Sequence, residues 1–351
     1  MQIAAVETAL PPNAYSQEEL IAAITAYWRA THHNPRRVEQ LHRAVAVGGR
    51  HLALPLDAYP GLRFGAANQA FIEVGTALAA EALTGALAAA GLDPSSLDAI
   101  FFTTVTGVAA PSIDARLVNR LGLRTDIKRT PMFGLGCVAG AAGIARMADY
   151  LRGHPDHAAA LVSVELCSLT LQREDLSIPN LIASGLFGDG AAAVIGLGSA
   201  HPAARGPRVR ASRARFYPGT EAVMGWDVGD NGFRIVLSAD VPAMVERHMR
   251  DDVDAFLGDA GLRRADVGTW ICHPGGPKVL QAFDAALELP PGALQRTWDS
   301  LAAVGNLSSA SVLFVLRDTL AAGRPAPGEP ALLLAMGPGF CSELVLLEGA
   351  A

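Results

Sequence analysis

The sequence predicts an α/β protein made of two related halves, each containing a sheet covered by helices. Strand-like and helix-like segments alternate along all 351 residues, and such alternation is typical of helix-covered, partly parallel sheets. Each half also carries one reactive-looking side chain in a Gly-rich turn before a helix of small residues, Cys137 in the first and Asn306 in the second. This internal similarity predicts duplicated αβα halves covering residues 1–203 and 204–351, with the junction in 196–207.

The individual elements follow from the spacing of apolar residues and from the turn residues at their ends. Apolar runs bounded by turn signals predict strands, at residues 3–6, 99–104, 129–134, 159–166, 191–196, 267–272, 331–336 and 341–347. Apolar residues at helical spacing predict helices, at residues 17–27, 73–90, 113–121, 140–151, 241–257, 278–287 and 308–321. Gly91 supports the end of the second helix, because glycine commonly follows a helix C-terminus.

The composition predicts a well-packed intracellular protein. Half of the residues are hydrophobic and 18% are charged, in a chain long enough to bury a large core. The net charge of −6 and the scattered charges argue against a nucleic-acid or anionic-membrane surface. No stretch approaches the roughly 20 apolar residues of a membrane span, and no signal peptide is expected. Four cysteines without C-x-x-C spacing predict neither disulfides nor a metal site, and a cytoplasmic location.

The segment around Cys137 is the first candidate for chemistry. Its sequence, Phe-Gly-Leu-Gly-Cys-Val-Ala-Gly, predicts a cysteine at a strand-to-helix turn. The positive end of the helix dipole is expected to lower the pKa of that thiol. The glycine spacing resembles a dinucleotide loop, but it reads GxGxxxG and lacks the following acidic residue. A buried, inert cysteine is the remaining alternative.

Two further segments strengthen the catalytic interpretation. His273 stands at the end of a predicted buried strand, and Asn306 stands at a predicted helix start. Alone, the first reads as a core histidine and the second as an N-cap. Together with Cys137, they provide a nucleophile and two donors for one developing oxyanion. This set suits a decarboxylating carbon–carbon condensation, in which Cys137 holds the acyl chain. On chemistry alone, a Cys-His-Asn hydrolase is also possible.

Five motifs in order along the chain resemble the signature set of the type III polyketide synthases, the chalcone synthase-like family of the thiolase superfamily. They are Gly-Leu-Gly-Cys137, Leu186-Phe-Gly-Asp-Gly190, Cys272-His-Pro-Gly-Gly-Pro277, Gly305-Asn-Leu-Ser-Ser309 and Gly337-Pro-Gly339. The resemblance implies a thiolase-like duplicated αβαβα layered fold, a homodimer, CoA thioesters as substrates, and no metal or other cofactor. Among family members, the chain is most similar in appearance to bacterial alkylresorcinol and alkylpyrone synthases.

The resemblance also implies individual roles. Cys137 is expected to be the nucleophile, with His273 and Asn306 as the decarboxylation and oxyanion pair. Phe187 and Phe233 match the gatekeepers between a CoA tunnel and the cavity. The remaining matches are expected to line that cavity: Thr106, Cys167, Thr170, Ser308, Gly337, Pro338 and Gly339.

The tunnel mouth departs from the family pattern. Of the basic residues that plant members carry there, only Arg43 and Arg50 remain. These arginines and Lys278 are the candidates for CoA phosphates, unless an acyl carrier protein delivers the starter. Ala109 and Ala110 stand where plant members have larger side chains, which is compatible with a tunnel for a long apolar starter.

The expected function is therefore iterative condensation of malonyl-CoA, or methylmalonyl-CoA, onto an acyl-CoA or acyl-carrier-protein starter. A long-chain starter would be cyclised to an alkylresorcinol or alkylpyrone. The main alternative is a ketoacyl-ACP synthase III-like enzyme that performs one condensation in fatty-acid synthesis. A catalytically silent carrier-binding subunit and a nonspecific thioesterase are the more distant alternatives.

Overall fold

The computed structural model describes residues 1–28 and 34–350. The strands are β1 (Gln2–Ala9), β2 (Asn13–Ser16), β3 (Gly49–Leu52), β4 (Ala99–Thr104), β5 (Lys128–Phe133), β6 (Ala158–Leu166), β7 (Asp189–Leu197), β8 (Arg208–Phe216), β9 (Met224–Gly229), β10 (Gly232–Leu237), β11 (Thr269–Cys272), β12 (Pro330–Gly337) and β13 (Cys341–Glu348). The helices are α1 (Gln17–Trp28), α2 (Pro35–Ala44), α3 (Phe64–Ala90), α4 (Ile113–Leu121), α5 (Ala139–Gly153), α6 (Ile178–Leu186), α7 (Val241–Asp259), α8 (Pro277–Leu287), α9 (Gln295–Val304) and α10 (Ser311–Ala321). Two short 3₁₀ turns precede central helices: η3 (Gly136–Val138) and η6 (Ser308–Ala310).

A nine-stranded sheet forms the frame, in the order β11-β12-β13-β8-β1-β7-β6-β4-β5. It consists of two parts, because β1 and β8 share only the residue pair Gln2 and Arg208. In the first part, β4 runs parallel to β5 and β6, whereas β7 is antiparallel to its neighbours β6 and β1. In the second part, β11 is parallel to β12, and the other pairs are antiparallel. The expectation of partly parallel sheets is confirmed.

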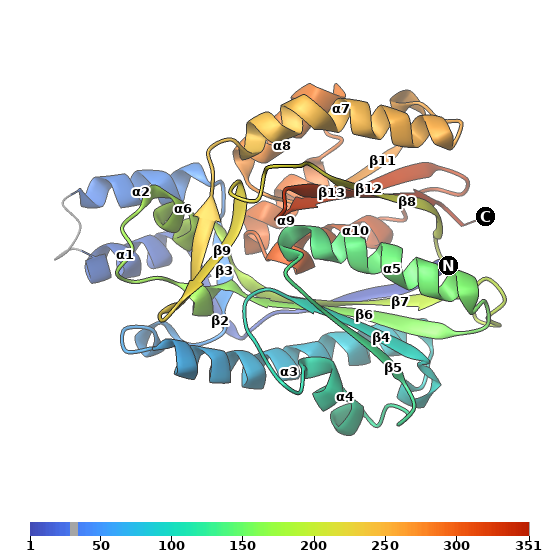
Figure 1. The fold of residues 1–351 in the computed structure, drawn as a ribbon, viewed down its shortest axis with the longest axis horizontal. Helices are drawn as coiled ribbons and strands as arrows, with labels where there is room; N and C mark the ends of the chain where they lie inside the picture. The colour runs from blue at the N-terminus through green and yellow to red at the C-terminus, as the bar shows by residue number, and fades with distance from the viewer. Residues whose placement is uncertain (29–33, 351) are drawn as a thin grey trace.

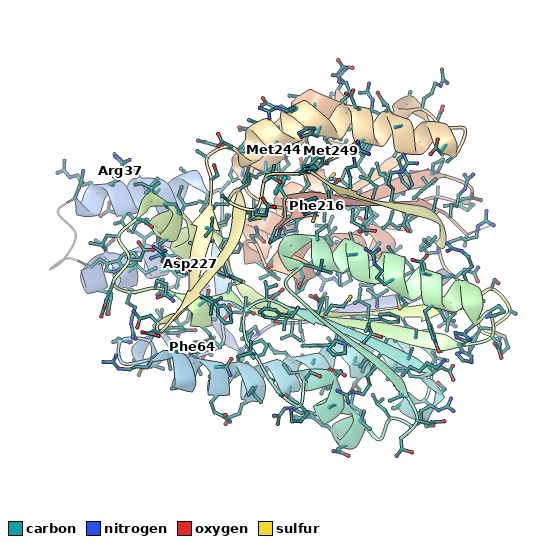
Figure 2. All side chains as sticks on the ribbon, in the orientation of Figure 1. Arg37, Phe64, Phe216, Asp227, Met244 and Met249 are labelled. Atoms are coloured by element: carbon teal, nitrogen blue, oxygen red, sulfur yellow. The ribbon has the colours of Figure 1, made fainter. Side chains whose placement is uncertain are left out.

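The helices cover both faces of each part of the sheet, which produces five layers (Figure 1). Helices α3 and α4 pack on the outer face of the first part, and α7 and α8 pack on the outer face of the second. Helices α5 and α10 lie between the two parts. Met244 and Met249 of α7 are buried in the outer core of the second part (Figure 2). The duplicated αβαβα layered fold is therefore confirmed.

The small residues of α5 allow the middle layer to pack closely. A Cβ atom on Gly140 would lie 2.3 Å from the carbonyl oxygen of Ser309. On Gly143 it would lie 2.5 Å from the Leu161 Cδ1 atom. Neither contact is sterically possible without movement, so glycine at these positions sets how closely α5 approaches η6 and β6.

Several elements differ from those predicted. Helix α3 begins at Phe64 rather than at residue 73, because the buried residues Ala67 and Phe71 continue the helical spacing despite the low helix propensity of Gly65 and Asn68. The helix expected over residues 308–321 starts as the 3₁₀ turn η6 and becomes α-helical only at Ser311. Strand β8 was not predicted because its alternating arginines leave few apolar residues. The short elements α2, α6, α9, β2, β3, β9 and β10 were also not predicted.

Helix α3 is long and apolar enough, by length and composition, to cross a membrane. It was not expected to meet that criterion. In the structure, one face of α3 packs against β1, β6 and β7, and its buried residues form part of the core beneath the first part of the sheet. This is the arrangement of a core helix in a soluble protein.

Candidate active site

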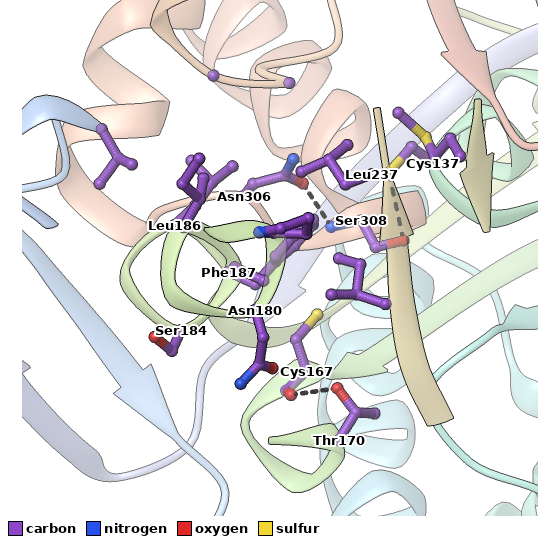
Figure 3. Close-up of a pocket in the computed structure, with 18 of the residues that line it drawn as sticks. Cys137, Cys167, Thr170, Asn180, Ser184, Leu186, Phe187, Leu237, Asn306 and Ser308 are labelled. Carbon is purple, nitrogen blue, oxygen red and sulfur yellow. Dashed lines mark hydrogen bonds between the residues drawn. The ribbon is translucent and has the colours of Figure 1, made fainter. Parts of the chain in front are cut away.

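A cavity of about 1220 Å³ opens at one end of the layers, bordered by α1, α2, α6 and the β9–β10 hairpin. It is lined by residues from both halves, and Figure 3 shows part of its wall. All three predicted catalytic residues line it. So do most of the other predicted site residues, namely Thr106, Cys167, Thr170, Phe187, Ser308, Pro338, Gly339, Arg50 and Lys278. Phe233, Gly337 and Arg43 do not.

Cys137 lies on η3, at the N-terminal end of α5, as predicted. Gly136 before it has φ +55°, and a Cβ there would lie 2.6 Å from Pro338 Cδ. The Cys137 thiol is 7% exposed and donates to Ser308 Oγ over 3.6 Å. Burial raises the pKa of this thiol to about 12, although the hydrogen bond with Ser308 opposes the rise. Burial therefore acts against the lowering of this pKa that was expected from the helix N-terminus.

His273 follows β11, and its backbone N–H donates to the Leu334 carbonyl over 2.9 Å. Its ring is 4% exposed, and burial lowers its pKa to about 3. Neither ring nitrogen has a hydrogen-bond partner in the described part of the chain. The imidazole is therefore neutral, and both nitrogens remain available to a substrate, one as donor and one as acceptor.

Asn306 is held by backbone hydrogen bonds from the other half. Its N–H donates to the Leu186 carbonyl over 2.9 Å, and its carbonyl accepts from Gly188 N–H over 3.0 Å. These bonds form a parallel bridge between Phe187 and Asn306. The Asn306 Oδ1 atom accepts from the backbone N–H of Ser308 over 2.8 Å (Figure 3). Since Oδ1 is used inside the protein, the NH2 group remains available to donate to a substrate oxygen.

The two predicted gatekeepers occupy different environments. Phe187 caps the end of α6 and lines the cavity. Phe233 is buried and packs edge-to-face on Phe64, with ring centroids 5.7 Å apart. Ile235, Val236 and Leu237 of the same strand line the cavity. Strand alternation places Phe233, Ile235 and Leu237 on one face, so it could not have shown which of them reaches the cavity.

A buried carboxylate lies behind the cavity wall, and the sequence did not single it out. Glu165 accepts from Thr106 Oγ1 over 2.8 Å and from Val105 N–H over 3.1 Å. Burial raises its pKa above the ordinary value. Cys167 and Thr170 lie nearby on the wall, where Thr170 Oγ1 donates to the Cys167 carbonyl over 2.8 Å. Burial also raises the pKa of the Cys167 thiol.

The three candidates for phosphate contact lie in three different environments. Arg43 is exposed and pairs with Glu18 over 2.9 Å and with Glu39 over 3.5 Å. Arg50 is buried, and its guanidinium donates to protein acceptors. Lys278 is exposed in the first turn of α8 at the cavity lining. Over residues 1–28 and 34–350, no cluster of His, Cys, Asp and Glu has the arrangement of a metal site.

Comparison with known proteins identifies the family. Residues 1–201 match the N-terminal domain of the chalcone and stilbene synthases, and residues 208–351 match their C-terminal domain. The chain is 55% identical over 349 residues to a 1,3,6,8-tetrahydroxynaphthalene synthase of Streptomyces peucetius subsp. caesius, covering 99% of this chain and 92% of that protein. This chain belongs to the chalcone and stilbene synthase family of type III polyketide synthases.

Other relatives agree with this assignment. The polyketide synthase is 34% identical over 357 residues to a putative chalcone synthase of Bacillus subtilis, covering 99% of this chain and 98% of that protein. Its fold matches the crystal structure of the tetrahydroxynaphthalene synthase of Streptomyces coelicolor, a bacterial type III polyketide synthase, with a TM-score of 0.94. That match has 29% sequence identity and covers 100% of both chains. The polyketide synthase is thus a thiolase-fold acyltransferase, and the ketoacyl-ACP synthase III alternative is not favoured.

Proposed function

We propose that this polyketide synthase joins malonyl units into 1,3,6,8-tetrahydroxynaphthalene. The 55% identity along nearly the whole chain to an enzyme named for that product carries the proposal. The ten-carbon skeleton corresponds to five two-carbon units. If malonyl-CoA supplies the starter and every extender, five malonyl-CoA give one naphthalene, five CO2, five CoA and one water.

Loading begins on the uncharged pair of Cys137 and His273. The Cys137 sulfur attacks the thioester carbonyl of the starter, and His273 accepts the thiol proton. The CoA sulfur then leaves and takes that proton. This route suits a thiol whose pKa burial raises to about 12 and an imidazole whose pKa burial lowers to about 3, because the thiolate need only exist during attack.

Extension uses the donors contributed by the second half. The NH2 group of Asn306 and the ring N–H of His273 donate to the thioester oxygen of a malonyl group. The bond to the carboxylate breaks, CO2 leaves, and its electron pair remains as an enolate. The enolate carbon attacks the acyl group on Cys137, whose sulfur leaves and then accepts the lengthened chain in exchange for CoA. Preorganised donors of this kind stabilise developing charge strongly in a dry site.

The roles of the residues around the reacting groups are also part of the proposal. Phe187 and the wall residues Thr106, Cys167, Thr170 and Ser308 are expected to enclose the growing chain and exclude water. Lys278 is the exposed cation best placed for a CoA phosphate. The edge strand β5 leaves Phe133 54% exposed beside the cavity, which supports a homodimer formed across this edge. A cytoplasmic location and the absence of any other cofactor remain predictions.

A second candidate function is extension of a long-chain starter to an alkylresorcinol or alkylpyrone. One part of the cavity favours this function. This part is lined by α1, α2 and α6, and its mostly apolar lining includes Leu20, Ile24, Leu41 and Ile182 beside the aromatic rings of Tyr27 and Trp28. An acyl chain in this part would be removed from water, and each buried CH2 contributes about 0.8 kcal/mol.

The test is an incubation of the purified protein with malonyl-CoA, alone and with acyl-CoA starters of increasing length, followed by mass spectrometry. A ten-carbon aromatic product from malonyl-CoA alone, with five CO2 released per molecule, would support the naphthalene proposal. Pyrones or resorcinols that require a long starter would replace it with the second candidate. A single β-ketoacyl thioester as the only product would contradict both.

A further inference from the structure

Arg50 on β3 carries a charge buried inside the protein beside the active site. Its side chain is 4% exposed. Its Nη1 donates to the Phe187 carbonyl over 2.6 Å, and its Nε donates to Gln17 Oε1 over 3.3 Å. Burial of a guanidinium is costly unless hydrogen bonds and nearby charge compensate. The buried carboxylate of Asp189 supplies part of that compensation, since it acts to raise the pKa of Arg50 against the effect of burial.

Gln17 connects this arginine to the helices that border the cavity. Its Nε2 donates to the His42 carbonyl over 3.0 Å and to the Gly185 carbonyl over 2.9 Å. The His42 Nε2 atom lies 3.0 Å from both the Leu181 carbonyl oxygen and Ser184 Oγ. One buried polar network therefore joins α1, α2 and α6 to the carbonyl of Phe187, through Arg50.

The aliphatic part of the Arg50 side chain lies against the turn that carries Asn306. A Cβ on Gly305, which has φ +75°, would lie 3.1 Å from Arg50 Cδ and 2.7 Å from the Leu186 carbonyl oxygen. The neighbouring backbone bonds join the Phe187 segment to Asn306 itself. Arg50 thus touches both sides of the bridge that holds the catalytic amide, whereas it has little surface left for a phosphate from the tunnel.

We propose that Arg50 is a positioning residue for malonyl decarboxylation rather than a ligand of the CoA phosphates. It acts through Phe187 and Asn306, because it holds the carbonyl of the first and supports the turn of the second. The inference rests on the proposed function, in which Asn306 donates to the malonyl thioester. Misplacement of such a group by about 1 Å can cost on the order of 100-fold in rate.

Two thioesters separate positioning from phosphate binding. Malonyl-CoA carries the CoA phosphates, whereas malonyl-N-acetylcysteamine carries none. With Arg50→Met, we expect kcat for CO2 release to fall roughly 10- to 100-fold on both substrates, with nearly unchanged KM values. Arg50→Lys keeps the charge and a donor and should recover part of this loss. A phosphate ligand would instead show a raised KM for malonyl-CoA alone, and that result would overturn the proposal.

Further variants separate this effect from unfolding. Arg208→Gln removes an exposed guanidinium that pairs with Glu348 at the β1–β8 junction, and it should leave both rates unchanged. If Arg50→Met does not fold, Gln17→Leu removes the acceptor of Arg50 Nε and should lower kcat on both thioesters by a smaller factor. An unchanged kcat in folded Arg50→Met or Gln17→Leu would overturn this inference and leave the proposed function standing. Absence of CO2 release by the wild type would instead overturn the proposed function, and the inference with it.

Discussion

The two halves place equivalent turns in the middle layer, but each turn serves a different purpose. In the first half, η3 carries Cys137 and leads into α5, whose first residues are alanine and glycine. In the second half, Asn306 precedes η6, which leads into α10, where large apolar residues follow Ser311. The first turn therefore presents a nucleophile at the start of a helix of small side chains. The second presents an amide before a helix of large side chains. Duplication of a scaffold evidently leaves the chemistry at equivalent positions free to diverge.

The halves also complete each other at the site. Ser308 of the second half accepts from the Cys137 thiol, and Pro338 leaves no space for a side chain at Gly136. In return, the first half holds Asn306 through the backbone next to Phe187. In the proposed mechanism, the first half supplies the sulfur on which the acyl chain is held, and the second half supplies the donors that stabilise the enolate. The following experiments test this division of labour.

The largest effect is expected from Cys137→Ala. Polyketide formation should fall by more than about 10³-fold, because no group remains to hold the acyl chain. Release of CO2 from malonyl-CoA should persist, since His273 and Asn306 are intact. Product is measured by mass spectrometry and CO2 by a coupled assay. Loss of both activities in a folded variant would contradict the division between the halves.

Asn306→Ala is the converse experiment, because it should impair decarboxylation and leave acylation of Cys137 intact. Removal of one oxyanion donor typically costs about 10²- to 10³-fold, so CO2 release should fall by that factor. Acylation of Cys137 by an acyl-CoA starter should still be visible as a mass increase of the intact protein. If decarboxylation were unaffected while acylation failed, the roles assigned to the two halves would have to be exchanged.

Gly140→Ala tests the close approach of the two turns. The added methyl group would meet the Ser309 carbonyl oxygen and the Val312 side chain, so the free energy of unfolding should fall by about 1–3 kcal/mol. Gly153→Ala in the same helix is the matched control, because a Cβ there meets nothing within 4 Å. Urea unfolding compares the two variants. Equal stability would mean that α5 can move away from η6 without cost.

The last experiment concerns the protonation of Cys137 and changes no residue of the site. Burial raises the pKa of Cys137 to about 12 and lowers that of His273 to about 3, so the resting pair is uncharged at neutral pH. Below its pKa, a thiol gains about tenfold in thiolate per pH unit. The rate of Cys137 alkylation by iodoacetamide, measured with Cys137→Ala as background, should rise about 100-fold from about pH 7 to about pH 9, which is tenfold for each of the two pH units. A plateau in this range would reveal a thiolate–imidazolium pair instead.

The sequence was sufficient for the layered fold and for the three residues that meet in the cavity. Periodicity identified the buried strands and most long helices, and the glycine-rich motifs marked the turns. Cys137 shows where this reasoning ends. Its place at a helix start was visible, but the burial that raises its pKa, and the hydrogen bond with Ser308 that opposes the rise, involve residues distant in sequence. Phe233 matched a motif, yet it is buried against Phe64, Phe133 and Trp226 and does not line the main cavity.

Arg50 shows a second limit of sequence reasoning. A basic residue in a segment associated with CoA suggested a surface role, whereas the structure has it bonded to Gln17 and the Phe187 carbonyl. Both partners are far from Arg50 along the chain, and one of them is a backbone atom that side-chain patterns do not reveal. Glu165 was overlooked for the same reason, because its partners Thr106 and Ser309 come from separate segments.

The bridge between Phe187 and Asn306 has a consequence for how such enzymes diversify. The frame around the amide is made by main-chain atoms, which every residue other than proline supplies at these two positions. Substitutions at either position can therefore occur during evolution while the backbone hydrogen bonds between the halves are kept. A lineage can then exchange one reactive group for another, or lose it, and keep a folded protein on which new activities can arise.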